Sequence, residues 1–132
     1  MTLRFDSVAI DSTNPSLAAD FWEAALGYAR TYQDDDEICL EPARDSAPAQ
    51  DSPTTSPTGP GLTFLRVPES KSVKNRLHLD LRPDDRDAEV ARLEALGARR
   101  IDVGQGPDVT WVVLEDPDGN EFCVLRALRA GE

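Results

Sequence analysis

The alternation of apolar and polar positions is clearest in residues 111–125, WVVLEDPDGNEFCVL. A β-branched and apolar run precedes residues 116–120, DPDGN, and a second apolar run follows them. Proline presets φ, aspartate bonds forward to the backbone, and glycine or asparagine accepts φ > 0, so this order is typical of a turn between two antiparallel strands. Strand alternation then places Glu121, Cys123 and Leu125 on one face of the second strand. We expect one face of this hairpin to line a cavity.

Two other stretches have the 3.6-residue periodicity of amphipathic helices. The first begins at Asn14-Pro15 or Ser16, and its predicted apolar stripe consists of Leu17, Ala18, Phe21, Trp22, Ala25 and Leu26. The second opens after Pro83, at Asp84 or Asp85, and its predicted stripe consists of Ala88, Val90 or Ala91, Leu93 and Leu96. Both stretches end in Leu-Gly, and glycine is the usual residue after a helix C-terminus.

Short strands are predicted on both sides of each helix. In the first half they cover residues 3–11, 28–33, 37–41 and 62–67, and in the second half residues 77–81, 98–103 and the hairpin. Both halves therefore run strand, helix, three strands, and the segment ADFWEAALGYARTY has the same spacing as AEVARLEALGARRI. This repeat predicts an α+β fold of two tandem βαβββ modules, whose curved mixed sheet encloses a ligand-binding cleft.

The chain has 132 residues, which is the size of one domain with a core of its own. We place module one at about residues 3–67 and module two at about 76–128. Residues 42–61 hold five of the ten prolines and almost no apolar side chains. Such a segment buries too little surface to offset its ordering entropy, so we predict a flexible loop, either a plain insertion or a lid over the cavity.

The charge and the cysteines narrow the classes of function. A net charge of −11 argues against nucleic-acid binding, which needs clustered lysine and arginine. No run approaches the roughly 18 apolar residues of a membrane span, and residues 1–5 lack a signal-peptide core. We therefore expect a cytoplasmic protein without membrane partners.

Cys39 and Cys123 form no CxxC pair, and in that compartment both are expected to be reduced, small, buried apolar residues.

Three segments in order, LAADFWEAALGY, NRLHLDL and LEDPDGNEFCVL, resemble the vicinal oxygen chelate superfamily. Within it, the chain is most similar to the glyoxalase-like branch, which is related to bleomycin resistance proteins. The resemblance covers almost the whole chain outside residues 42–61. It implies the fold and a homodimer, but the superfamily includes lyases, dioxygenases, epimerases, thiol transferases and antibiotic-sequestering proteins, so it does not imply one reaction.

Metal-dependent members of the superfamily hold a divalent cation with His or Glu at four strand positions. The resemblance places these positions at Ser7, within residues 62–67, at His78 and at Cys123. Only His78 is a ligand of the family's kind, so we predict no metal cofactor in the usual place. The alternative is a substituted divalent metal site formed by His78, Asp80 and Cys123.

Candidate ligand-binding residues gather near the expected cleft. They are Phe64, Arg66, His78, Asp80, Trp111, Glu121 and Cys123. His78 is either a general acid or base oriented by Asp80 or a structural, hydrogen-bonded histidine. Phe64 and Trp111 are either cavity walls or core residues. Arg66 is a partner for Asp80 or for an anionic ligand, and the basic residues of segment 71–76 form salt bridges or capture an anion at the cleft.

These observations predict a glyoxalase-like, small-molecule-binding protein that acts without the usual metal. It is either a sequestering protein or an enzyme of unassigned reaction. One alternative is a metal-dependent lyase or dioxygenase with substituted ligands, and another is a dimeric, bleomycin resistance-like protein that sequesters a cationic antibiotic.

Overall fold

A computed structural model describes residues 2–43 and 59–132, and it divides into two compact units, Met1–Ser70 and Lys71–Glu132. The two predicted modules fall within these units. Most of the segment predicted to be a flexible loop or lid, residues 44–58, lies outside the described residues. Among the described residues, no helix is both long enough and apolar enough to cross a membrane.

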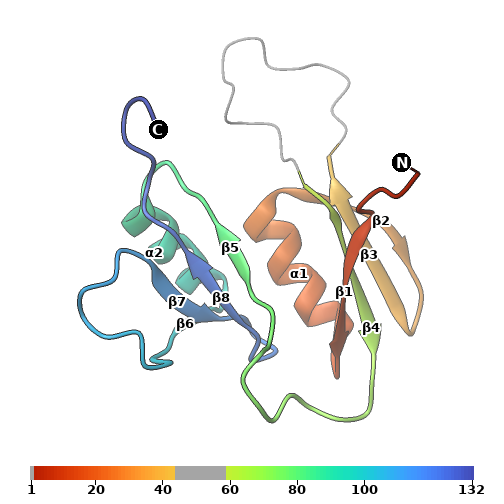
Figure 1. Cartoon of the computed structure of the whole chain (residues 1–132). Coiled ribbons are helices and arrows are strands. Elements are labelled where there is room, and N and C mark those ends of the chain that lie inside the picture. Colours follow the sequence, from red (N-terminus) through yellow and green to blue (C-terminus); the bar gives the residue numbers. More distant parts are fainter. Residues whose placement is uncertain (1, 44–58) are drawn as a thin grey trace. The chain divides into compact units, whose positions relative to one another are not determined.

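The described residues of unit 1 form one helix and a four-stranded mixed sheet (Figure 1). Its elements are β1 (Ser7–Ser12), α1 (Pro15–Leu26), β2 (Tyr28–Gln33), β3 (Glu37–Pro42) and β4 (Gly61–Arg66). The strand order is β1-β4-β3-β2, with β1 parallel to β4 and the other pairs antiparallel. Helix α1 packs against all four strands and covers one face of the sheet. The core of this unit lies between the helix and that face.

The ends of α1 follow from its sequence. The side chain of Asn14 accepts the Leu17 N–H at 3.2 Å, and Pro15 occupies the first turn, where no backbone donor is needed. Gly27 ends the helix with a φ of 68°. The predicted stripe is wrong at Leu17, which is 47% exposed. Leu17 lies about 140° around the helix from the buried Trp22 and about 40° from the buried Phe21, and so it lies at the border of the buried face.

Unit 2 repeats this topology. Its elements are β5 (Leu79–Leu81), α2 (Arg86–Leu96), β6 (Arg99–Arg100), β7 (Val112–Glu115) and β8 (Glu121–Val124). The strand order is β5-β8-β7-β6, with β5 parallel to β8 and the other pairs antiparallel. Asp85 caps α2 by accepting the Ala88 N–H, and Gly97 follows its C-terminus. The predicted α+β fold with two βαβββ repeats is confirmed.

The stripe predicted for α2 is only partly correct. Val90 and Leu93 are buried, whereas Ala88 and Leu96 are exposed. The helix sequence, RDAEVARLEAL, has fewer large apolar residues than that of α1, so it covers a smaller area of its sheet. The strands predicted over residues 77–81 and 98–103 are likewise shorter, at three and two residues.

The β7–β8 hairpin is built as its turn sequence predicts. One oxygen of the Asp116 carboxylate accepts the backbone N–H groups of Asp118 and Asn120, each at 2.9 Å. The Gly119 N–H donates to the Asp116 carbonyl at 2.9 Å, and Gly119 has a φ of 86°. Asp116 is only 3% exposed, so its buried carboxylate holds the turn together from the inside through these two hydrogen bonds. This turn sets Val113 opposite Cys123 in the sheet.

Candidate functional site

A cavity of about 410 Å³ lies within unit 2. One wall is the face of the sheet that carries Val113, Glu121, Cys123 and Leu125, and the loop residues Val103, Gly104 and Gln105 line it from another side. The sequence predicts that one face of the hairpin lines a cavity, and in the structure the face with Glu121, Cys123 and Leu125 does so. It did not identify the loop residues, because a glycine-containing loop has no periodicity that marks its inward side chains.

His78, Asp80 and Cys123 form the polar end of this cavity. The parallel register of β5 and β8 pairs Asp80 with Cys123, and strand alternation brings His78, two residues earlier, to the same face. His78 Nδ1 lies 2.9 Å from Asp80 Oδ1 and 3.9 Å from Cys123 Sγ. The His78 and Asp80 side chains are exposed, whereas Cys123 is buried. The three residues therefore offer nitrogen, oxygen and sulfur to one small volume.

The geometry of the thiol does not favour nucleophilic catalysis. Burial raises the pKa of the Cys123 thiol, and the negative charge and hydrogen bond of Asp80 raise it further. The contacts of Asp80 and Cys123 are both made with the same ring nitrogen of His78. In a catalytic triad the carboxylate and the nucleophile bind opposite nitrogens of the imidazole. Cys123 is therefore a protonated thiol at neutral pH rather than an activated nucleophile.

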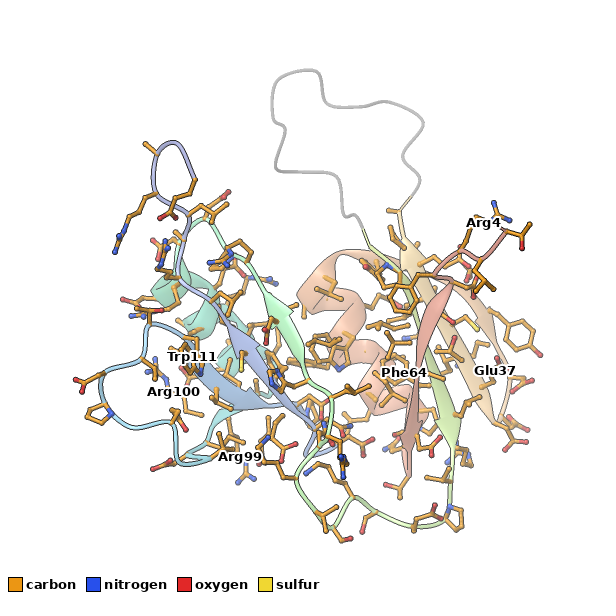
Figure 2. The ribbon with its side chains drawn as sticks, in the orientation of Figure 1. Arg4, Glu37, Phe64, Arg99, Arg100 and Trp111 are labelled. Carbon is orange, nitrogen blue, oxygen red and sulfur yellow. The ribbon has the colours of Figure 1, made fainter. Side chains whose placement is uncertain are left out.

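Trp111 provides the aromatic wall. It precedes β7 and is 39% exposed, with its side chain at the cavity (Figure 2). The other tryptophan, Trp22, is 2% exposed in the core of unit 1. A partly exposed indole beside a concave apolar surface is a stacking position for a flat ligand.

The sequence also matches a known domain family. The glyoxalase-like domain family covers residues 7–125. The chain belongs to this family. No curated protein matches it by sequence.

The glyoxalase-like domain also resembles several solved structures. An enzyme of the glyoxalase/bleomycin resistance protein/dioxygenase family from Burkholderia phytofirmans PsJN is 18% identical, with a TM-score of 0.65 and coverage of 96% of this chain and 100% of that one. The bleomycin resistance determinant encoded on transposon Tn5 is 17% identical, with a TM-score of 0.58 and coverage of 96% and 100%. The bleomycin-binding protein of Streptomyces verticillus, complexed with copper(II)-bleomycin, is 14% identical, with a TM-score of 0.59 and coverage of 97% and 99%. These similarities show a shared fold.

Apart from His78, the residues at the positions where the resemblance places the superfamily's metal ligands do not fit its His and Glu ligand set. Ser7 presents a neutral hydroxyl, and β4 with the residue after it, GLTFLRV, contains no His or Glu. The last position is Cys123, whose sulfur favours softer ions than a carboxylate does. No step of the family's metal chemistry can therefore be assigned to these four positions.

Two predicted binding residues of this glyoxalase-like domain lie elsewhere, in unit 1. Phe64 is 0% exposed and belongs to the core between β4 and α1, so it is not a cavity wall (Figure 2). Arg66 donates to the carbonyls of Asp35 and Thr13, at 2.8 and 3.3 Å, and lies 3.8 Å from an oxygen of Asp36. The structure thus gives Arg66 partners in neighbouring loops of unit 1 rather than Asp80.

Glu121 lines the cavity, but its carboxylate already has hydrogen-bond partners within the protein. Its carboxylate accepts from Lys71 Nζ at 2.8 Å and from the Asn75 N–H at 3.0 Å. Burial raises the pKa of Glu121, but these two hydrogen bonds outweigh it and hold the pKa below its usual value. The salt-bridge interpretation of the basic segment is therefore confirmed at Lys71, whereas Lys74 lines the cavity. Glu121 fastens residues 71–75 to β8.

Replacing Glu121 by Gln is expected to destabilise the protein by about 1–3 kcal/mol, because the Lys71 ammonium, on a side chain that is 21% exposed, loses its charged partner. Urea unfolding at neutral pH measures the change. The control is Glu69→Gln, a charge change at an exposed position, for which we expect a change within about 0.5 kcal/mol. Equal losses in the two variants would show that the Lys71 bridge does not stabilise the fold.

Proposed function

We propose that this glyoxalase-like domain reversibly binds a flat organic molecule in the cavity of unit 2. The observation that carries the proposal is the partly exposed Trp111 at a 410 Å³ cavity whose polar end consists of His78 and Asp80. A volume of this size is within the range of small-molecule sites in proteins, about 300–1,000 Å³.

The lining suggests how such a ligand would be oriented. Trp111, Val113 and Leu125 provide apolar contact, and a flat ring stacked on the indole gains dispersion and electrostatic energy. At the polar end, Asp80 accepts a hydrogen bond from a donor group on the ligand, and a cationic donor makes that bond stronger. Glu121 adds little, because its charge is matched by Lys71. Lys74, which also lines the cavity, offsets part of the charge of Asp80, so we infer a preference for aromatic ligands with a hydrogen-bond donor.

Binding, rather than covalent catalysis, is the activity that the site supports best. Cys123 is a buried thiol with a raised pKa. Asp80 and Cys123 contact the same ring nitrogen of His78, so the imidazole is not placed to take the thiol proton as it would in a catalytic triad. Two solved structures that share the fold are described as a bleomycin resistance determinant and a bleomycin-binding protein. Sequestration of a bleomycin-like or other aromatic compound is accordingly the form of binding that we propose to test first.

A thermal-shift screen of aromatic and cationic compounds, including bleomycin, tests the proposal. A ligand present at 100 times its dissociation constant adds about 2.7 kcal/mol of stability and raises the melting temperature. Trp111→Ala is expected to weaken binding of such a ligand about 5- to 30-fold, since stacking and apolar contact of about 1–2 kcal/mol are lost.

The matched control is Tyr32→Ala, which removes an exposed aromatic side chain from β2 of unit 1. It should leave the dissociation constant unchanged. Failure of every compound to raise the melting temperature would contradict the proposal, and so would an unchanged affinity in Trp111→Ala.

A further inference from the structure

We infer that His78, Asp80 and Cys123 together bind one thiophilic divalent cation, with Zn²⁺ as the biological candidate. Their donor atoms all lie within 4.8 Å of one another, and all three residues belong to unit 2. The inference goes beyond the binding of an organic ligand and is tested without one, although a bound ion would engage Asp80 in place of a donor group on the ligand.

The distances suit a tetrahedral ion. Zn²⁺ binds nitrogen, oxygen and sulfur ligands at about 2.0–2.3 Å, so neighbouring ligand atoms in a tetrahedral site lie about 3.3–3.6 Å apart. The observed separations from His78 Nδ1 are 2.9 Å to Asp80 Oδ1 and 3.9 Å to Cys123 Sγ. These values lie on either side of the tetrahedral distance. All three donor atoms lie within 4.8 Å of one another, and side-chain rotations would bring them to the shorter separations around an ion.

The backbone already holds these donors together. Asp80 and Cys123 are paired residues on the adjacent parallel strands β5 and β8. Glu121, two residues before Cys123, binds Lys71 and the backbone of Asn75, and so it fixes the segment that leads to His78. Donors on paired strands lose little conformational freedom when they bind an ion. The same three residues line the cavity, and a fourth position on the ion is therefore open to water or to a ligand.

The donor types select the ion. A thiolate and an imidazole favour Zn²⁺, Co²⁺ or Cd²⁺, whereas Mg²⁺ and Mn²⁺ favour sites made of oxygen ligands. Binding would form a metal–sulfur bond and release the thiol proton of Cys123 to the solvent. The set differs from the His and Glu ligands of the superfamily's usual site because it contains Cys123 and Asp80. We therefore expect a change of ion preference, with Zn²⁺ bound at least 100-fold more tightly than Mn²⁺.

Calorimetric titration of the metal-free protein with Zn²⁺, without any organic ligand, tests the site. We expect one ion per chain and a dissociation constant below about 1 µM. Titration with Co²⁺ should produce a near-ultraviolet charge-transfer band from thiolate to cobalt. Cys123→Ser should abolish that band and weaken Zn²⁺ binding at least 10-fold.

Two further variants keep the test decisive if Cys123→Ser folds poorly. Cys39→Ser removes the other free cysteine, which lies on β3 of unit 1, and should retain both the band and the affinity. Asp80→Asn should keep the charge-transfer band but weaken Zn²⁺ binding about 10-fold. Absence of stoichiometric binding, loss of the band in Cys39→Ser, or tighter binding of Mn²⁺ than of Zn²⁺ would overturn the inference.

Discussion

Replacing Phe64 by Ala is expected to lower the free energy of unfolding by about 3–5 kcal/mol. Phe64 is 0% exposed on β4, where it pairs with Ile10 of β1 and Ile38 of β3 beneath α1. Truncation removes a large apolar side chain and leaves a cavity that the surrounding sheet and helix cannot close. Urea unfolding followed by far-ultraviolet circular dichroism measures the loss.

The control for this prediction is Phe5→Ala. Phe5 is 73% exposed, so its truncation should change the stability by no more than about 0.5 kcal/mol. The ligand affinity of folded Phe64→Ala protein should equal that of the wild type, because Phe64 lies in the core of unit 1. A small loss of stability combined with a large loss of ligand affinity would instead make Phe64 a binding residue.

The second large effect is expected at the hairpin turn of unit 2. Asp116→Ala should destabilise the protein by about 2–4 kcal/mol, since two partly buried backbone donors, the N–H groups of Asp118 and Asn120, lose a charged acceptor. Hydrogen exchange of the amides in β7 and β8 should accelerate together with the global loss of stability.

Asp116→Asn is the matched control, because its side-chain oxygen still accepts both N–H groups. We expect it to lose less than half as much stability as Asp116→Ala. If the two variants are equally destabilised, the carboxylate geometry is not what holds the turn. If neither variant is destabilised, the turn forms without the two hydrogen bonds to the side chain of residue 116.

Features fixed by local chemistry could be predicted from the sequence. The β7–β8 turn follows from residues 116–120, where aspartate, proline and glycine each have one backbone role. The helix ends follow from the same kind of local signal, with Asn14 and Asp85 as caps and glycines at the C-termini. Strand alternation alone also brought Glu121 and Cys123 to the cavity face.

Features fixed by distant partners could not be predicted. Phe64 and Trp111 are both aromatic residues in or beside apolar strands, and packing between β1, β3 and α1 makes the first a core residue. Glu121 is a carboxylate beside the expected site, but Lys71, 50 residues away, satisfies it. Arg66 is held by carbonyls of two loops that its own strand does not specify. The sequence patterns give the faces of the strands, while the contacts between elements decide which side chains remain available to a ligand.

Binding beside Trp111 is tested most directly by NMR. The chain has two tryptophans, so a ¹H–¹⁵N spectrum should contain two indole N–H signals, which Trp111→Phe assigns. A compound found by thermal shift should move the signal of Trp111 in proportion to occupancy and leave that of the buried Trp22 in place. A saturable shift of the Trp22 signal with none at Trp111 would contradict a binding site in the cavity of unit 2.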